Sequence, residues 1–270
     1  MNIALRVTKR LLPSWLRVKL ILGYSSLKSW WKYQDSTFPS HIWIEVCTQC
    51  NRSCWYCTNS VKAIPEKVMS LATFAAILSK LKEIRWTGPI GYHYLSEPLL
   101  HPDIETMVAM TKNALPGSMP IIFTNGDHLT LGKAMDLKWA GLAKCSITRH
   151  KPVTAEWEQR MKDVCAVDPS MFTVTDLHKS ELINFAGVIK GLKNQPMNKR
   201  CMSPKRVLPI RINGDISLCC CDYEQTHTFG NVLEHPILDL WQQMHWVVLR
   251  DDLMGGVRTL DICQNCTGTK

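Results

Sequence analysis

The sequence predicts an α/β fold, a partial (β/α)6 TIM-like barrel followed by a small cysteine-rich C-terminal domain. Strand-like segments alternate with amphipathic helices between residues 41 and 176, which is typical of a parallel sheet with crossover helices. The pattern changes near Pro196, after which residues 207–221 alternate around Asn213-Gly214, a strong hairpin signal. Twelve cysteines gather mainly in one loop and in the C-terminal region, and they indicate metal or redox chemistry.

Each expected element follows from the local character of the sequence. Strands are short runs rich in β-branched and aromatic residues, and helices carry apolar residues at helical spacing, as after the N-cap candidate Ser70. The expected strands are residues 41–48, 90–95, 119–125, 143–148 and 171–176, and the expected helices are 71–84, 103–114, 130–141, 154–166 and 236–250. In β/α barrels the active site lies where strands end, so the loop at residues 47–57 is well placed for function.

Length and composition describe a globular protein. The chain has 270 residues, 46% of them hydrophobic and 20% charged, which suits one or two domains. We divide it into a basic N-terminal extension (1–38), a barrel (39–195) and a C-terminal cysteine domain (196–270). The formal net charge is +9, and the first 34 residues contribute seven basic residues and no acidic one. The remainder is close to neutral, which disfavours a nucleic-acid-binding protein.

The basic extension suggests two roles. Its basic, aromatic and aliphatic residues could lie on an anionic membrane surface, or they could form a helix packed on the core. It does not resemble a secretory signal, because Pro13 and scattered charges interrupt any apolar stretch. The sequence has no run of about 18 apolar residues that could span a membrane. We expect a cytoplasmic protein with reduced cysteines, and peripheral membrane contact as an option for this segment.

Four cysteines, Cys47, Cys50, Cys54 and Cys57, fall within eleven residues. Two C-x-x-C pairs could clamp one zinc ion, but such pairs are usually separated by about fifteen or more residues, against three here. Alternatively, Cys50, Cys54 and Cys57 form a C-x3-C-x2-C triad. Three thiolates on a [4Fe–4S] cluster leave one iron without a protein ligand, which is an open position for a substrate or cofactor.

The segment "CNRSCWYC", which follows an expected strand, resembles the signature of the radical S-adenosylmethionine (SAM) superfamily. The resemblance implies a barrel of the radical SAM type, in which Cys50, Cys54 and Cys57 hold a [4Fe–4S] cluster whose open iron chelates SAM. An electron from this cluster would cleave SAM into methionine and a 5′-deoxyadenosyl radical. Cys47 is then a strand-end residue outside the triad, and Tyr56 lies near the adenine.

Three further segments resemble SAM-binding motifs of this family. The segment "YLSEPLLHPD" (94–103) resembles G-E-P-L-L-H-P, with Ser96 where the family usually has glycine, and "FTNGDHL" (123–129) matches a T-N-G segment. The segment "SITRH" (146–150) departs from the usual pattern, and its Thr148 or Arg149 could reach the ribose or carboxylate of SAM. The resemblance implies SAM contacts from Tyr56, Ser96, Glu97, Pro98, Thr124, Asn125 and Thr148.

A second cysteine set, Cys201, Cys219, Cys263 and Cys266, resembles the C-terminal auxiliary-cluster domain called SPASM, in its short "twitch" form. The resemblance implies one auxiliary [4Fe–4S] cluster with four cysteine ligands, and a complete ligand set suits electron transfer. Strand alternation places Cys219 and Cys221 on one face and Cys220 on the other, and either neighbour could replace Cys219. A structural zinc held by the same four thiolates is the alternative.

The implied chemistry starts with abstraction of a hydrogen atom from a small-molecule substrate. Loss of a second electron to the auxiliary cluster would oxidise a sugar, cyclitol or related molecule, with His150, His178 or Arg149 as candidate bases for the alcohol proton. Return of a hydrogen atom would instead give epimerisation, for which the candidate donors are Cys145, Cys165, Cys220 and Cys221. A flavodoxin or ferredoxin is the expected reductant.

Two further alternatives stay open. Many SPASM enzymes modify peptides, but only some 40 residues precede the barrel here, fewer than a leader-binding domain needs. A protein of another class, a non-enzymatic zinc-binding module, would also account for cysteine pairs.

Overall fold

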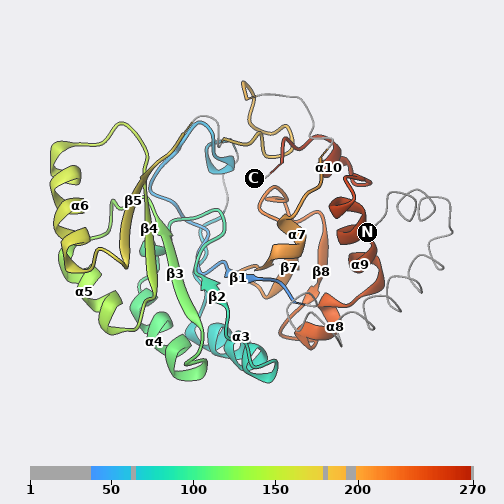
Figure 1. Ribbon diagram of the computed structural model, residues 1–270, viewed down its shortest axis with the longest axis horizontal. Coiled ribbons are helices and arrows are strands. Elements are labelled where there is room, and N and C mark those ends of the chain that lie inside the picture. Colours follow the sequence, from blue (N-terminus) through green and yellow to red (C-terminus); the bar gives the residue numbers. More distant parts are fainter. Residues whose placement is uncertain (1–37, 62–64, 179–181, 193–198, 269–270) are drawn as a thin grey trace.

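The computed structural model describes residues 38–61, 65–178, 182–192 and 199–268 (Figure 1). The predicted basic extension lies outside these residues except for Phe38. Among the helices that the structure describes, none is long and apolar enough to cross a membrane.

One mixed sheet organises the described part of the chain, with the strand order β5-β4-β3-β2-β1-β6-β7-β8. The pairs from β5 through to β6 are parallel, and β7 and β8 are added antiparallel. Five of the six parallel strands, β1–β5, lie in the predicted barrel, and the sixth, β6, comes from the region predicted as the C-terminal domain. The predicted fold class of a partial barrel is confirmed. The strands are β1 (His41–Ile44), β2 (Pro89–Gly91), β3 (Met119–Thr124), β4 (Lys144–Arg149), β5 (Phe172–Asp176), β6 (Val207–Ile210), β7 (Asp215–Ser217) and β8 (Thr228–Asn231).

Helices cover the outer side of the parallel strands (Figure 1). Three of them begin at a side-chain N-cap, because the hydroxyls of Ser70, Thr130 and Thr154 each accept a hydrogen bond from the backbone three residues later. These capping residues lie where the sequence predicts helix starts. The helices are α3 (Leu71–Glu83), α4 (Ile104–Ala114), α5 (Leu131–Trp139) and α6 (Ala155–Val167), with short 3-10 turns η1 (Thr58–Ser60) and η2 (Pro98–Leu100).

The C-terminal region contains short helices beside β6–β8, namely α7 (Ser203–Arg206), α8 (Ile237–Trp241), α9 (Met244–Met254) and α10 (Asp261–Gln264). The prediction of one helix over residues 236–250 is wrong, because the chain breaks between α8 and α9, where Gln243 is extended. The break places Trp241 and Trp246 5.4 Å apart and nearly fully buried. In one continuous helix, residues five apart would not share a face.

The predicted hairpin around Asn213-Gly214 is confirmed. The backbone N–H of Arg211 bonds the carbonyl of Asp215 at 2.8 Å, and Gly214 has φ of +90°, which favours glycine. The first strand of this hairpin, β6, also pairs in parallel with β1 over four residues. The sheet therefore continues across residue 196, and the predicted domain boundary there stays a prediction.

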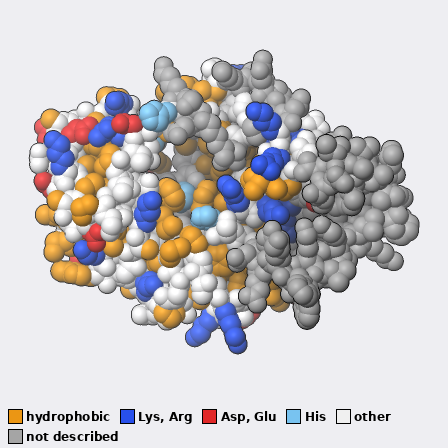
Figure 2. All heavy atoms as spheres, viewed as in Figure 1, with side chains coloured by type: hydrophobic (Ala, Val, Ile, Leu, Met, Phe, Trp, Pro, Cys, Tyr) orange, Lys and Arg blue, Asp and Glu red, His pale blue; other side chains and the backbone are white. Residues whose placement is uncertain are grey.

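The two faces of the sheet differ in what covers them. The Tyr92 ring packs against Phe74 of α3 in a tilted arrangement and its hydroxyl donates a hydrogen bond to Thr111 of α4, so its side of the sheet faces the helices. Strand alternation puts Ile42 and Ile122 on that side and Trp43 and Phe123 on the concave side. Figure 2 shows the molecule hollowed near its centre, with hydrophobic and histidine side chains beside the hollow.

We predict that Leu81→Ala in α3 lowers the free energy of unfolding by about 3 kcal/mol, because Leu81 is fully buried in the core and its loss leaves a cavity. Lys82→Ala, on the exposed face of the same helix, is the control and should change stability by less than about 0.5 kcal/mol. Urea unfolding followed by circular dichroism measures both. Equal effects would contradict this packing of α3.

Candidate active site

The first cysteine loop follows β1 and is anchored by Cys47. This residue is fully buried, and its backbone forms an isolated antiparallel β-bridge with Val68. Its thiol donates a hydrogen bond to the carbonyl of Glu97 at 3.3 Å. Its sulfur therefore belongs to the core, as expected for a residue outside the triad. Beyond it the loop turns at Cys54–Cys57, where the Cys57 N–H bonds the Cys54 carbonyl at 2.9 Å.

The triad cysteines fit a metal–sulfur cofactor. Cys50 is exposed and lies within electrostatic reach of Cys54 and Cys57. Burial raises the pKa of Cys57, and charge on Cys54 raises it further, so a cation beside this thiol would favour its thiolate form. Among the described residues, no three Cys, His, Asp or Glu side chains gather as tightly as the ligands of one metal ion. The fit to a cluster rests on the all-thiol donor set at a loop after a barrel strand.

A bidentate ion pair fixes this loop to the loop after β3. Arg52 donates to both carboxylate oxygens of Asp127, each at 2.6 Å, and Asn51 donates to the same carboxylate at 2.7 Å. Asn125 in turn donates to the side-chain oxygen of Asn51 at 2.8 Å. The guanidinium of Arg52 holds the pKa of Asp127 below its usual range, so the pair is intact at neutral pH.

A buried carboxylate joins the segments after β2 and β3. Glu97 is 2% exposed and accepts hydrogen bonds from the Thr124 hydroxyl at 2.7 Å, the Asn125 N–H at 2.8 Å and the Leu99 N–H at 3.1 Å. Burial raises the pKa of Glu97 and these hydrogen bonds oppose the rise. The structure thus brings together the predicted SAM contacts Ser96, Glu97, Pro98, Thr124 and Asn125 at one edge of the sheet.

Tyr56 and His150 form a second contact between the cysteine loop and the barrel. The Tyr56 hydroxyl and His150 Nδ1 are 2.7 Å apart, and the rings lie nearly parallel. Burial lowers the pKa of His150 and the nearby Arg52 charge lowers it further, so the imidazole is neutral near pH 7. A neutral imidazole can accept a proton, and the side chain of His150 is hydrogen-bonded to the cysteine loop.

The other two predicted bases lie elsewhere. Arg149 pairs with Asp176 at 2.8 Å and with Glu158 of α6 at 2.9 Å, and the hydrogen bond to Asp176 raises its pKa. Its guanidinium therefore lies on the helix side of β4, and Thr148 on the opposite, concave side. His178 is exposed, two residues beyond β5. The roles predicted for these three residues stay predictions.

The second cysteine set also converges. Burial, together with the neighbouring sulfurs of Cys219, Cys201 and Cys266, raises the pKa of Cys263 to about 12. Cys263 and Cys201 thus both lie near the other predicted ligands, and an all-thiol set suits an iron–sulfur cluster. Arg258 lies among them, donating a hydrogen bond to the Cys263 carbonyl at 2.6 Å, and its positive charge can balance the thiolates.

Cys221 lies beside this set. Its sulfur is buried and 3.5 Å from that of Cys266. Its thiol also interacts with those of Cys219 and Cys220, so Cys219 as the cluster ligand stays a prediction. Cys220 interacts with Cys221 and with Cys266.

A short chain of contacts links the two cysteine regions. Tyr94, just past β2, donates its hydroxyl to the carbonyl of Cys219, and its ring lies 4.3 Å from the Arg211 guanidinium. Arg211 forms a buried ion pair with Glu45 at 2.8 Å. The sequence interpretation missed Asn51, Arg52, Tyr94, Asp127, Arg211 and Arg258. Arg52 and Asp127 lie inside the motifs "CNRSC" and "TNGD", and only the fold shows that they meet.

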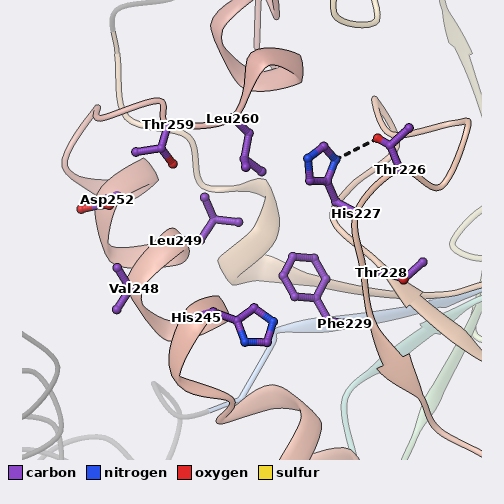
Figure 3. A pocket seen from close by; sticks show the side chains of 10 residues that line it. All are labelled: Thr226, His227, Thr228, Phe229, His245, Val248, Leu249, Asp252, Thr259 and Leu260. Carbon is purple, nitrogen blue, oxygen red and sulfur yellow. Dashed lines mark hydrogen bonds between the residues drawn. The ribbon is translucent and has the colours of Figure 1, made fainter. Parts of the chain in front are cut away.

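A separate cavity of about 520 Å³ lies between β8, α9 and the segment before α10 (Figure 3). Phe229 and His245 stack across it, and Thr226 is hydrogen-bonded to His227 at 2.8 Å. None of the predicted site residues lines it, so we place the chemistry at the cysteine sets instead.

We predict that iron content separates the cysteine roles. The wild-type chain, purified and reconstituted without oxygen, should hold about eight irons, and both Cys219→Ala and the triple variant Cys50→Ala, Cys54→Ala, Cys57→Ala about four. Cys221→Ala is the matched control and should keep about eight. Loss of four irons in Cys221→Ala, with retention in Cys219→Ala, would reverse the ligand assignment. Zinc with little iron would contradict both clusters.

We predict that Asp127→Ala weakens SAM binding about tenfold, because Arg52 loses its bidentate partner and the cysteine loop loses its tie to the loop after β3. Isothermal titration of SAM into the reconstituted protein measures this. Glu83→Ala, which removes an exposed ion pair with Lys80 on α3, is the control and should leave SAM affinity unchanged. Unchanged affinity in Asp127→Ala would show that the tie does not position the site.

Comparisons with known proteins agree with this geometry. The family model SPASM, an iron-sulfur cluster-binding domain, matches residues 201–267. The S-adenosyl-L-methionine-dependent 2-deoxy-scyllo-inosamine dehydrogenase of Niallia circulans is 31% identical over 230 residues, which cover 84% of this chain and 92% of that protein.

Solved structures give the same result. BtrN in complex with AdoMet and 2-DOIA has a TM-score of 0.77 and 32% identity, over 86% of this chain and 94% of that one. An anSMEcpe structure with bound AdoMet has a TM-score of 0.58 over 80% of each chain, and at 10% identity it supports the fold alone. The similarity to a SAM-dependent dehydrogenase contradicts the alternative of a non-enzymatic zinc-binding module. The chain belongs to the radical SAM enzymes that carry a C-terminal SPASM domain, and its cofactors are SAM and iron–sulfur clusters.

Proposed function

We propose that this enzyme is a dehydrogenase that oxidises an alcohol carbon of a cyclitol or a related saturated ring. The observation that carries the proposal is the convergence of Cys201, Cys219, Cys263 and Cys266, a complete thiol set that suits an electron acceptor. The relative from Niallia circulans, a dehydrogenase of 2-deoxy-scyllo-inosamine, supports the substrate class.

When bound, the first cluster with SAM supplies the radical that removes a hydrogen atom, and the auxiliary cluster supplies an acceptor for the second electron. The chain itself orients these groups. Cys50, Cys54 and Cys57 would hold the first cluster, the segment around Glu97 and Asn125 would bind SAM, and Arg52–Asp127 keeps these loops in register. His150, neutral and partly buried, could take the alcohol proton directly, or through the Tyr56 hydroxyl, which would give its own proton to Nδ1 as it takes the proton of the alcohol.

Epimerisation is the less favoured outcome. Of its candidate hydrogen donors, Cys145 is fully buried on the helix side of β4, opposite Ser146. Cys165 belongs to α6, which covers the same side. Cys221 lies against Cys266, and with Cys220 it stays a candidate donor only if the substrate reaches the auxiliary set.

Further proposals concern the electron donor, the cellular location and membrane contact. We place electron entry from a flavodoxin or ferredoxin at the cysteine loop, where Trp55 is 57% exposed and Cys50 is exposed. We also propose a cytoplasmic location. Peripheral membrane contact is a proposal for the basic extension, which lies outside the described residues except for Phe38.

We predict that the reconstituted enzyme, given SAM, reductant and 2-deoxy-scyllo-inosamine, forms 5′-deoxyadenosine together with a product lighter by two hydrogen atoms. Mass spectrometry follows both, and a reaction in deuterated water is run in parallel. Product with no deuterium on the reacting carbon supports oxidation. Deuterium on that carbon in a product of unchanged hydrogen count would establish epimerisation instead. The triple cysteine variant at positions 50, 54 and 57 is the control and should form neither compound.

A further inference from the structure

Three aromatic rings line the concave side of the sheet on neighbouring strands. Trp43 lies on β1, His93 two residues beyond β2, and Phe123 on β3. The ring centroids of Trp43 and His93 are 4.8 Å apart, and those of His93 and Phe123 are 4.5 Å apart. Neighbours in the strand order thus place the three rings in one row, which we call the aromatic row.

The aromatic row is accessible although it is apolar. Phe123 is 39% exposed, and both Trp43 and His93 keep part of their surface exposed, whereas the residues on the other side of these strands are fully buried. A large apolar side chain left open on the inner side of a barrel is a surface that a ligand can cover. Core packing alone would have buried it.

Gly91 makes the row possible. A Cβ atom at this position would lie 2.9 Å from Cδ1 of Trp43 and 3.3 Å from Nδ1 of His93. Any other residue would therefore displace the indole, the imidazole or both. The glycine has no positive φ to explain it, so its role is to leave room for the two rings.

The imidazole of His93 has unused hydrogen-bonding capacity. Its Nδ1 is buried and has no hydrogen-bond partner among the described residues. Burial lowers the pKa of His93 to about 4, so the ring is neutral near pH 7 and offers one donor and one acceptor. A buried polar atom without a partner costs stability, and a ligand that bonds it would recover that cost.

We propose that Trp43, His93 and Phe123 form the floor of the substrate site. They would bind the uncharged C–H face of a saturated ring that carries hydroxyl groups. The C–H face of such a ring would cover Trp43 and Phe123, and one hydroxyl would bond the imidazole of His93. The inference rests on the proposed function for its choice of a cyclitol, and it adds the residues that recognise the ring. A site that bonds a hydroxyl through a buried polar group rejects analogues lacking that hydroxyl.

Equilibrium binding tests the aromatic row without requiring turnover. Reconstituted enzyme loaded with SAM, without reductant, is titrated with 2-deoxy-scyllo-inosamine, myo-inositol and cyclohexanol. His93→Phe keeps a ring and loses both nitrogens. For whichever cyclitol the wild type binds, we expect this variant to raise the Kd about tenfold. His93→Gln should recover part of that loss, and Phe123→Leu should also weaken binding. His235→Phe, at an exposed position after β8, is the matched control and should bind as the wild type does.

Each outcome decides the proposal. Cyclohexanol should bind far more weakly than the polyhydroxylated rings, and the Kd of SAM should change by less than about twofold in His93→Phe. Equal loss of SAM and cyclitol affinity would mean a structural role and would overturn the proposal, as would unchanged cyclitol affinity or no cyclitol binding by the wild type. Binding that depends on His93 without any oxidised product would support the aromatic row and reject only the proposed dehydrogenase activity.

Discussion

The buried carboxylate of Glu97 holds together the three segments on which the active site depends. Its oxygens accept from Thr124, Asn125 and Leu99, its own N–H bonds the carbonyl of Gln49, and its carbonyl accepts from the Cys47 thiol. A carboxylate taken out of water is costly unless donors surround it, and here the donors are the end of β3 and the start of η2. The contacts of Glu97 therefore fix the cysteine loop, the segment before η2 and the loop after β3 relative to one another.

A second buried charge extends this order to the auxiliary cysteines. Glu45 and Arg211 are only 2% and 3% exposed. Removing both charges from water costs free energy, and the ion pair offsets this cost only because each residue has further partners. Arg211 stacks on Tyr94, whose hydroxyl reaches the carbonyl of Cys219 and lies 3.0 Å from the Ser217 hydroxyl. β6 carries Arg211 into the sheet beside β1, so the domain that holds the second cluster is built onto the same sheet as the first. This continuity sets the distance between the two redox sites.

Short contiguous motifs could be read from the sequence, and contacts between distant residues could not. The cysteine triad, the segment around Glu97 and the hairpin at Asn213-Gly214 each carry their signal within about ten residues, because a turn or a strand end fixes them locally. Arg52 and Asp127 are 75 residues apart and meet only once β1 and β3 share a sheet. The helix expected over 236–250 failed for the same reason, since its apolar spacing suited a helix while the packing of Trp241 against Trp246 required a break.

Substrate recognition is where this limit matters most. Cofactor contacts are made by loops at strand ends, which share sequence patterns across a family, whereas the floor of a barrel is made by single residues, one from each strand. Trp43, His93 and Phe123 are separated by 30 residues or more along the chain, and each would be an ordinary strand residue by its local sequence. What distinguishes them is the side of the strand they occupy, the glycine that makes room for them and the imidazole that nothing in the described chain bonds. Enzymes that share this scaffold can therefore keep the radical-generating loops intact and change substrate by exchanging a few inward-facing side chains.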